Sequence, residues 1–452
     1  MAGLEVRDSL LFAACRLASA GAGWMAPAYL LWRGLLGHDD LSRRKERLGF
    51  ASIKRPAGNL ILLYAGEAAE ARILPPLEAK LVELGFTVLL LTGSAEAAPF
   101  FLPRLPQVLH QLAPMSAPQL VARCLDHWQP LAVLIAGEVI PLNLVCEARR
   151  RGLLAALVDA SMPPRTFSIW CKFPGLAASL FRQIALCLAR TDADGERFAA
   201  LGMRNVETTG NLKYDCTALP ADQAALARLV ARIGTRPVWL AEAIAPGEEE
   251  IAIEAHCGLA LELPNLLTVI VPRNARRAAE ICQIAEKAGL RATAGSLNEN
   301  SGPLPDVFIA HKDKEAAGLF YRSAGVVFCG GSLSDGQGAN PLLPAGLGCA
   351  ILHGPESEEF EEIFTELDKS GGGALVTDAQ ALVRQLSLLF SDAARLRAMG
   401  RAAAATAELS GGASRRIIKA LAPFLCQAVT ASAGRPMKAR RDKNDINAPA
   451  GV

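Results

Sequence analysis

Short apolar runs alternate with longer stretches of mixed apolar and polar residues along most of the chain after residue 58. In the first half, the runs have the length and composition of buried strands, and residues 68–84 have the spacing of a helix. The candidate strands are Leu60–Tyr64, Phe86–Leu91, Leu131–Ile135 and Leu154–Val158. Strand–helix alternation of this kind favours a parallel sheet that is covered by helices on both faces.

The second half repeats this alternation, with helical stretches at 275–289 and 357–368. Its candidate strands are Pro237–Ala241, Leu267–Val271, Val307–Ile309, Val326–Cys329 and Ala350–Leu352. A chain of 452 residues is too long for one ordinary core. We therefore predict an α/β protein with two Rossmann-like domains, 49–225 and 226–428, that face a cleft. Ligands of such sheets bind beyond the carboxyl ends of the strands.

The N-terminal stretch Leu10–Trp32 is apolar except for Arg16 and Ser19. A helix that crosses a bilayer needs about 20 apolar residues. We predict that residues 1–48 form a membrane-anchor and basic segment that is short or only partly inserted. Its basic residues, between 33 and 47, favour the cytoplasmic side and attract anionic headgroups. The alternative is a buried N-terminal helix followed by a solvated charged turn.

The C-terminal segment and the composition indicate less about the function. Residues 429–452 are basic and rich in small and polar residues, which predicts a disordered tail. The net charge of +2 does not favour a nucleic-acid partner. The 11 cysteines and 6 histidines are scattered without metal-ligand spacing, so we expect reduced, buried thiols, no metal site and no cofactor.

Two local patterns in the second half are typical of anion binding. The sequence Gly330-Gly331-Ser332-Leu333 follows a candidate strand, and Asn340 belongs to a second group of small and polar residues just beyond it. Small residues there allow backbone N–H groups to approach a phosphate. Arg273 also follows a strand, where it could hold a phosphate with two hydrogen bonds or form a surface salt bridge.

Two carboxylates follow the first strand of the first half. Glu67 and Glu70 stand in the sequence Tyr64-Ala65-Gly66-Glu67-Ala68-Ala69-Glu70. Either could act as a general base that faces the cleft. Either could equally stabilise the amino end of the following helix through the helix dipole.

Taken together, these motifs resemble the 3-deoxy-D-manno-octulosonic acid (Kdo) transferase family, over a span from about Ala26 to about Ala404. The resemblance covers the blocks that carry the motifs, in matching order. They are Trp32-Arg33 to Glu46-Arg47-Leu48-Gly49, His110-Gln111, Leu125-Asp126-His127-Trp128-Gln129-Pro130, Gly210-Asn211-Leu212-Lys213-Tyr214-Asp215, Pro246-Gly247-Glu248-Glu249, Pro272-Arg273, Gly330-Gly331-Ser332-Leu333 and Asn340-Pro341-Leu342.

The resemblance implies a GT-B glycosyltransferase that moves Kdo from CMP-Kdo to a lipid A precursor in lipopolysaccharide core biosynthesis. It implies action at the cytoplasmic face of the inner membrane, with 49–225 as the acceptor domain and 226–428 as the nucleotide-sugar domain. By the same resemblance Glu70 is the base, and Arg273, Gly330, Gly331, Ser332 and Asn340 bind the nucleotide. Secondary site residues are Glu67, Lys213 and Glu315.

Two other functions stay open because the chain departs from the family pattern at several motif positions, including Ala243-Ile244-Ala245, Asn274 and Leu343. One is a catalytically weak relative that binds lipid A precursors or a partner enzyme at the membrane. The other is a GT-B transferase that uses another nucleotide sugar.

Overall fold

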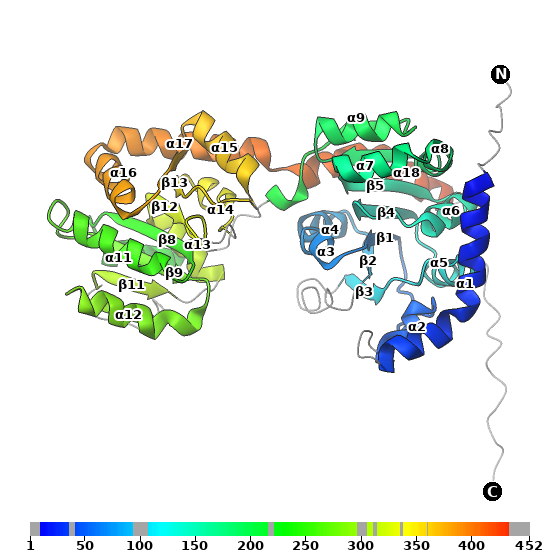
Figure 1. The fold of residues 1–452 in the computed structure, drawn as a ribbon, viewed down its shortest axis with the longest axis horizontal. Coiled ribbons are helices and arrows are strands. Elements are labelled where there is room, and N and C mark those ends of the chain that lie inside the picture. Colours follow the sequence, from blue (N-terminus) through cyan, green and yellow to red (C-terminus); the bar gives the residue numbers. More distant parts are fainter. Residues whose placement is uncertain are drawn as a thin grey trace, which may run out of the picture. The chain divides into compact units, whose positions relative to one another are not determined.

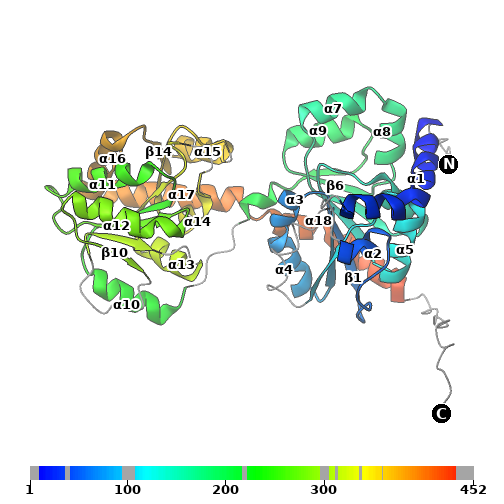
Figure 2. The ribbon, with the colours of Figure 1, turned by 60° about the horizontal axis from the view of Figure 1, so that its bottom comes forward.

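The computed structural model describes residues 10–35, 41–93, 107–215, 221–295, 305–310, 314–334, 338–358 and 360–433. It divides the chain into two compact units (Figures 1 and 2). The first unit contains the chain up to Leu212 together with the segment from Ala413 onward, and the second contains Lys213–Gly412. Each unit is an α/β layer structure around its own parallel sheet, as the alternating pattern predicts.

The sheet of the first unit has the order β3-β2-β1-β4-β5-β6-β7. The described strands are β1 (Leu60–Ala65), β2 (Thr87–Thr92), β3 (Val108–Leu112), β4 (Ala132–Gly137), β5 (Leu154–Ala160), β6 (Leu186–Ala189) and β7 (Val206–Thr208). Because β1 pairs with β2 on one side and β4 on the other, the chain reverses its direction of growth between β1 and β4. That reversal is the topological switch point at which such sheets bind ligands.

Helices cover both faces of this sheet, with η1 (Leu41–Arg43) beside them. They are α1 (Leu10–Leu35), α2 (Arg44–Arg47), α3 (Ala68–Arg72), α4 (Pro75–Glu83), α5 (Pro118–Trp128), α6 (Leu142–Arg150), α7 (Pro164–Cys171), α8 (Pro174–Phe181), α9 (Asp192–Ala200) and α18 (Ala413–Ala433). The single helix that we predicted over 68–84 is two helices, because Pro75 and Pro76 cannot continue the hydrogen-bond ladder of α3.

The sheet of the second unit has the order β10-β11-β9-β8-β12-β13-β14. Its strands are β8 (Val238–Ile244), β9 (Leu267–Pro272), β10 (Ala292–Gly295), β11 (Val307–Ala310), β12 (Val326–Cys329), β13 (Ala350–His353) and β14 (Gly373–Leu375). The helices are α10 (Gln223–Ile233), α11 (Glu248–Leu259), α12 (Ala278–Lys287), α13 (Lys314–Ser323), α14 (Leu342–Ala345), α15 (Glu361–Ser370), α16 (Ala379–Ser391) and α17 (Ala393–Ser410), with short turns η3 (Leu212–Tyr214) and η4 (Ala275–Arg277). Here the switch point lies between β8 and β12.

The division of the chain differs from the predicted boundaries at both ends of the second domain. The second unit begins at Lys213, whereas we predicted that it begins at residue 226. Residues 413–428, which we expected in the second domain, belong to the first unit. Their helix, α18, lies in the first unit and contacts α4 (Figure 2). It buries Ile417, Leu421 and Leu425 in the same apolar cluster as residues of β1 and α4. The helix also continues to Ala433, beyond the predicted start of the tail at 429, and residues 434–452 lie outside the described residues.

The N-terminal helix α1 packs along α5 and α8 (Figure 1). Within the described residues, none of the helices combines the length and the apolar character that crossing a bilayer requires.

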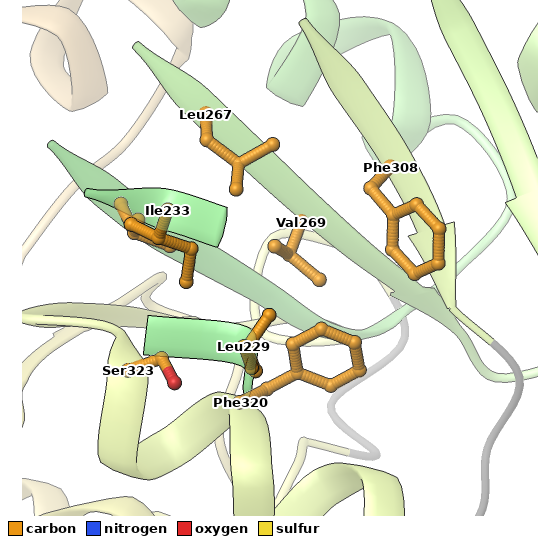
Figure 3. Close-up of a pocket in the computed structure, with 8 residues that line it drawn as sticks. Leu229, Ile233, Leu267, Val269, Phe308, Phe320 and Ser323 are labelled. Atoms are coloured by element: carbon orange, nitrogen blue, oxygen red, sulfur yellow. The ribbon is translucent and has the colours of Figure 1, made fainter. Parts of the chain in front are cut away.

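The second unit contains a small apolar pocket between α10, α13 and the sheet (Figure 3). It is lined by Leu229, Ile233, Val238, Leu267, Val269, Phe308, Phe320 and Ser323. Ser323 is its one polar lining residue. Such a lining cannot satisfy the charges of a nucleotide, so we treat the pocket as a gap in the core packing.

Candidate functional site

Glu70 lies at the switch point of the first unit, in the first turn of α3, the helix that follows β1. Its carboxylate accepts hydrogen bonds from three backbone N–H groups: Gly66 at 2.7 Å, Glu67 at 3.1 Å and Glu138 at 2.9 Å. Its side chain is buried. The first two donors belong to the loop after β1, and the third belongs to the loop after β4. Glu70 therefore ties together the two loops that border the switch point.

The close approach of Glu70 to the end of β4 requires a glycine there. Gly137 has a φ of +79°, and a Cβ atom at this position would lie 1.9 Å from Glu70 Oε1. Both facts exclude a larger residue. The local sequence Gly137-Glu138 thus allows the carboxylate of Glu70 to reach the backbone N–H of Glu138.

Glu67 and Glu138 are exposed next to this buried carboxylate. Partial burial raises the pKa of Glu138 above its ordinary value; Arg190 opposes this rise, and the carboxylates of Glu70 and Glu67 add to it. We did not single out Glu138 from the sequence. Its position three residues after the apolar run Leu131–Ile135 is the signal that could have identified it, because polar residues after parallel strands lie at the ligand-binding edge.

A second polar pair lies at the ends of β5 and β6. The carboxylate of Asp159 is fully buried and accepts hydrogen bonds from Arg190 Nε at 2.8 Å and from the backbone N–H of Leu212 at 2.8 Å. Burial raises the pKa of Asp159, although Arg190 and the Leu212 N–H act in the opposite direction. The first unit therefore carries Glu67, Glu70, Glu138, Asp159 and Arg190 along one edge of its sheet.

The basic segment 41–47, which follows α1, contacts the same edge of the sheet, where the carboxyl ends of the strands lie. Arg47 donates to the backbone oxygens of Gly93 and Ala113, which follow β2 and β3. Burial and the charge of Glu70 raise the pKa of Tyr64 above its ordinary value, and the charge of Arg47 opposes this rise. Arg47 thus belongs to the site, whereas the sequence indicated only a role at the membrane.

Arg43 and Glu46 hold this segment on β3. Arg43 pairs with Glu46 at 2.7 Å, and Glu46 accepts the backbone N–H of Leu112 at 2.7 Å. His110 lies between Arg43 (3.3 Å) and Thr92 (2.8 Å). Burial, with the Arg43 charge, lowers the pKa of His110 to about 4, so the neutral ring accepts from Arg43 and donates to Thr92.

In the second unit, the backbone N–H groups of the predicted anion-binding loop donate hydrogen bonds to other groups of the protein. The backbone N–H groups of Gly331 and Leu333 donate to the carboxylate of Glu248, at 2.5 and 2.9 Å. The N–H of Gly330 donates to Glu242 O at 2.7 Å, and a Cβ atom on Gly330 would lie 2.7 Å from that same oxygen. Ser332 is fully buried; its hydroxyl donates to Cys329 O and accepts the N–H of Gly354.

The remaining predicted site residues have different surroundings. Arg273 follows β9 and is two strands away from the loop, since β8 lies between β9 and β12. At about 4.8 Å per strand this separation is about 10 Å, well within the span of a nucleotide. Asn340 accepts the backbone N–H of Leu342 at 3.0 Å. Lys213 places its ammonium 4.3 Å from the ring centre of Phe360. The side chain of Glu315 lies outside the described residues.

The two units and their switch-point sites define a GT-B type of fold. A glycosyltransferase from Rickettsia africae has the same fold, with a TM-score of 0.53 and 9% identity; the match covers 83% of this chain and 99% of that one. A UDP-GlcNAc 2-epimerase from Neisseria meningitidis, solved with UDP-GlcNAc, also has a TM-score of 0.53, with 16% identity and a match that covers 81% of this chain and 100% of that one.

Sequence comparison shows which proteins the chain resembles. A family model described as 3-deoxy-D-manno-octulosonic-acid transferase (kdotransferase) matches residues 42–216. The 3-deoxy-D-manno-octulosonic acid transferase of Haemophilus influenzae is 28% identical over 420 residues, which cover 88% of this chain and 96% of the relative. The chain is thus similar to Kdo transferases over most of its length, which confirms the resemblance drawn from its motifs.

Proposed function

We propose that the protein is a glycosyltransferase that moves Kdo from CMP-Kdo to a hydroxyl group of a lipid A precursor, in lipopolysaccharide core biosynthesis. The observation that carries this proposal is the group of carboxylates at the switch point of the first unit, in a chain that is similar to Kdo transferases. Transfer to a hydroxyl requires a proton acceptor beside the attacking oxygen, and a carboxylate there can supply it.

Glu70 is the proposed proton acceptor. A carboxylate has about four lone-pair sites, and the three backbone N–H groups occupy three of them. Two of these donors bind Oε2 and one binds Oε1, so Oε1 keeps one position for the acceptor hydroxyl. The backbone donors hold the carboxylate in a fixed orientation, which favours proton transfer from a positioned substrate.

The reaction then balances as a simple substitution. The acceptor oxygen forms a bond to the anomeric carbon of Kdo and gives its proton to Glu70. The bond between that carbon and the CMP phosphate breaks, and the electron pair leaves with the phosphate. Arg273 is the proposed partner of this phosphate, because a guanidinium can stabilise the negative charge that develops on it.

We also propose that α1 attaches the protein to a membrane by its outer face, at the cytoplasmic face of the inner membrane. Its side chains that face the protein include polar ones: Arg16 pairs with Glu147 at 3.6 Å, and Ser19 accepts from Asn143 at 3.0 Å. The outward side is apolar, and Leu17 and Trp24 are 74% and 86% exposed. The inward side also buries Phe12, Ala26 and Leu30, so the helix is held firmly to its own protein. A helix that is fixed in this way and apolar on its outer side is suited to lie in the interface of a bilayer.

A transfer assay with CMP-Kdo and a lipid A precursor tests the proposed function directly. Product formation supports it. A wild-type protein that binds CMP but forms no product would instead favour a catalytically weak, lipid-binding relative. A protein that binds another nucleotide and not CMP would favour a transferase with a different donor.

A further inference from the structure

Glu248 is a buried carboxylate that no part of the proposed reaction uses. It is the first residue of α11, and its side chain is 1% exposed. Its two oxygens accept four hydrogen bonds. The donors are the backbone N–H groups of Ala245 (3.0 Å), Gly331 (2.5 Å) and Leu333 (2.9 Å) and the hydroxyl of Ser334 (3.3 Å).

These donors form the kind of concavity that binds an external anion in other proteins. Successive backbone N–H groups of a glycine-containing turn converge on one point, with Gly331 at a φ of +76°. Here the protein fills the concavity with its own carboxylate. The loop of residues 330–334 is thereby attached to the amino end of α11, across the switch point between β8 and β12.

We propose that Glu248 is a positioning residue for the nucleotide site: an internal anion that fixes the loop 330–334 in the shape that accepts the donor. The functional part of this proposal rests on the proposed transfer from CMP-Kdo. The structural part predicts that removal of the side chain leaves an anion site that a small carboxylate from solution can fill.

The substitution Glu248→Ala tests this directly, because it deletes a group with the size and charge of acetate. Hydrogen–deuterium exchange should show faster exchange of the Gly331 and Leu333 amides in the variant than in wild type. Acetate at tens of millimolar should restore their protection, and chloride at equal ionic strength should not. Unchanged exchange at these two amides, or no effect of acetate on them, would overturn the proposal.

Glu249 provides a matched control on the same helix. Its side chain is 0% exposed, but its partners are the N–H of Gly247 and the guanidinium of Arg277, both outside the loop 330–334. Glu249→Ala should leave the exchange of Gly331 and Leu333 unchanged, with or without acetate. Equal loosening of the loop in both variants would show a general effect of α11 and would overturn the specific role of Glu248.

Kinetics then test the functional part. Glu248→Ala should raise the KM for CMP-Kdo on the order of tenfold, which is less than the roughly 10²-fold loss that a 1 Å misplacement of reacting groups can cause, and acetate should lower it again. Glu248→Gln keeps the volume of the side chain and should raise the KM for CMP-Kdo without rescue by acetate. If the alanine variant does not fold, the glutamine variant replaces it in the kinetic test. A KM that stays at the wild-type value in both variants would remove the functional part.

The two proposals fail in different ways. If the wild type transfers no Kdo, the proposed function is wrong, but the amide exchange of the loop still decides whether Glu248 fixes it. If the wild type transfers Kdo and the exchange does not change in Glu248→Ala, the proposed function stands and the role of Glu248 is wrong.

Discussion

The switch points of the two units use the same device in different surroundings. In each unit a glutamate near the start of the helix after the first strand accepts N–H groups from two loops, one on each side of the reversal. Glu70 does so with Gly66, Glu67 and Glu138, and Glu248 does so with the loops at 245 and 331–334. The difference is in access. Exposed carboxylates stand beside Glu70, which is 8% exposed, whereas Glu248 is 1% exposed beneath its loop.

A buried carboxylate can have a structural role or a chemical one. In both units the carboxylate of a glutamate holds two loops together through hydrogen bonds, and we call such a carboxylate a clamp. In the first unit the clamp, Glu70, also lies near Glu67, Glu138 and Arg190, where a hydroxyl group could approach one of its oxygens. We infer that the chemical role of a clamp depends on the residues around it more than on the clamp itself.

The largest expected effect comes from Glu70→Gln, which should lower kcat for transfer about 10²–10⁴-fold, the typical loss when a general base is removed. CMP affinity should stay within a few-fold of wild type. The same change at Glu248 removes a clamp without removing a base, so Glu248→Gln should leave kcat within about tenfold of wild type. Glu67→Gln should lower kcat less than Glu70→Gln does. Steady-state kinetics of the three variants measure these effects. Equal losses of kcat at Glu70 and Glu248 would mean that Glu70 is only a clamp.

The next effect concerns the apolar outer face of α1. Leu17→Glu together with Trp24→Glu should release the protein from lipid vesicles with anionic headgroups. Each apolar side chain contributes roughly 1.5–3 kcal/mol when fully buried, so the double change should weaken binding by about 10²-fold if both side chains are buried in the bilayer interface. Leu261→Glu is the matched control, since Leu261 is 94% exposed in the second unit. Vesicle co-sedimentation measures the effect, and equal retention of both variants would contradict the role of α1.

Arg273→Ala should weaken CMP binding about tenfold or more, because a hydrogen bond to a charged group contributes roughly 1.5–3 kcal/mol. Arg276 is exposed in the same turn after β9 and serves as the control. Arg276→Ala should bind CMP with nearly wild-type affinity. Isothermal titration calorimetry of the two variants measures the difference, and a wild-type affinity for Arg273→Ala would exclude Arg273 from the phosphate site.

The smallest effect is on the stability of the first unit at acidic pH. The pKa of His110 is lowered to about 4 in the folded protein, so between pH 6.5 and 4 the unfolded chain binds a proton that the folded chain does not. This stabilising contribution is full above pH 6.5 and is lost as the pH falls through 4. It amounts to at most about 3 kcal/mol. Unfolding of His110→Gln by urea should therefore vary less over this pH range than unfolding of wild type, and equal slopes would contradict this assignment.

The sequence predicted local features well and long-range pairings poorly. Apolar runs such as Leu60–Tyr64 identified the strands because burial on both faces requires continuous apolar residues. Glu67 and Glu70 were identified as candidates because they follow such a run. The partners of Glu248 could not be predicted, since Gly331 lies far along the chain and only folding brings it near. The contacts of Arg47 with Gly93 and Ala113 were hidden for the same reason.

The return of α18 to the first unit has a consequence for biosynthesis. The second unit, Lys213–Gly412, is an uninterrupted insertion in the chain, whereas the first unit is completed only by residues after Gly412. During translation the second unit can fold as soon as it leaves the ribosome, while β1 and α4 wait for Ile417, Leu421 and Leu425 to cover them. A chain that ends prematurely before residue 413 should therefore expose an apolar surface on its N-terminal half and become a substrate for chaperones or proteases.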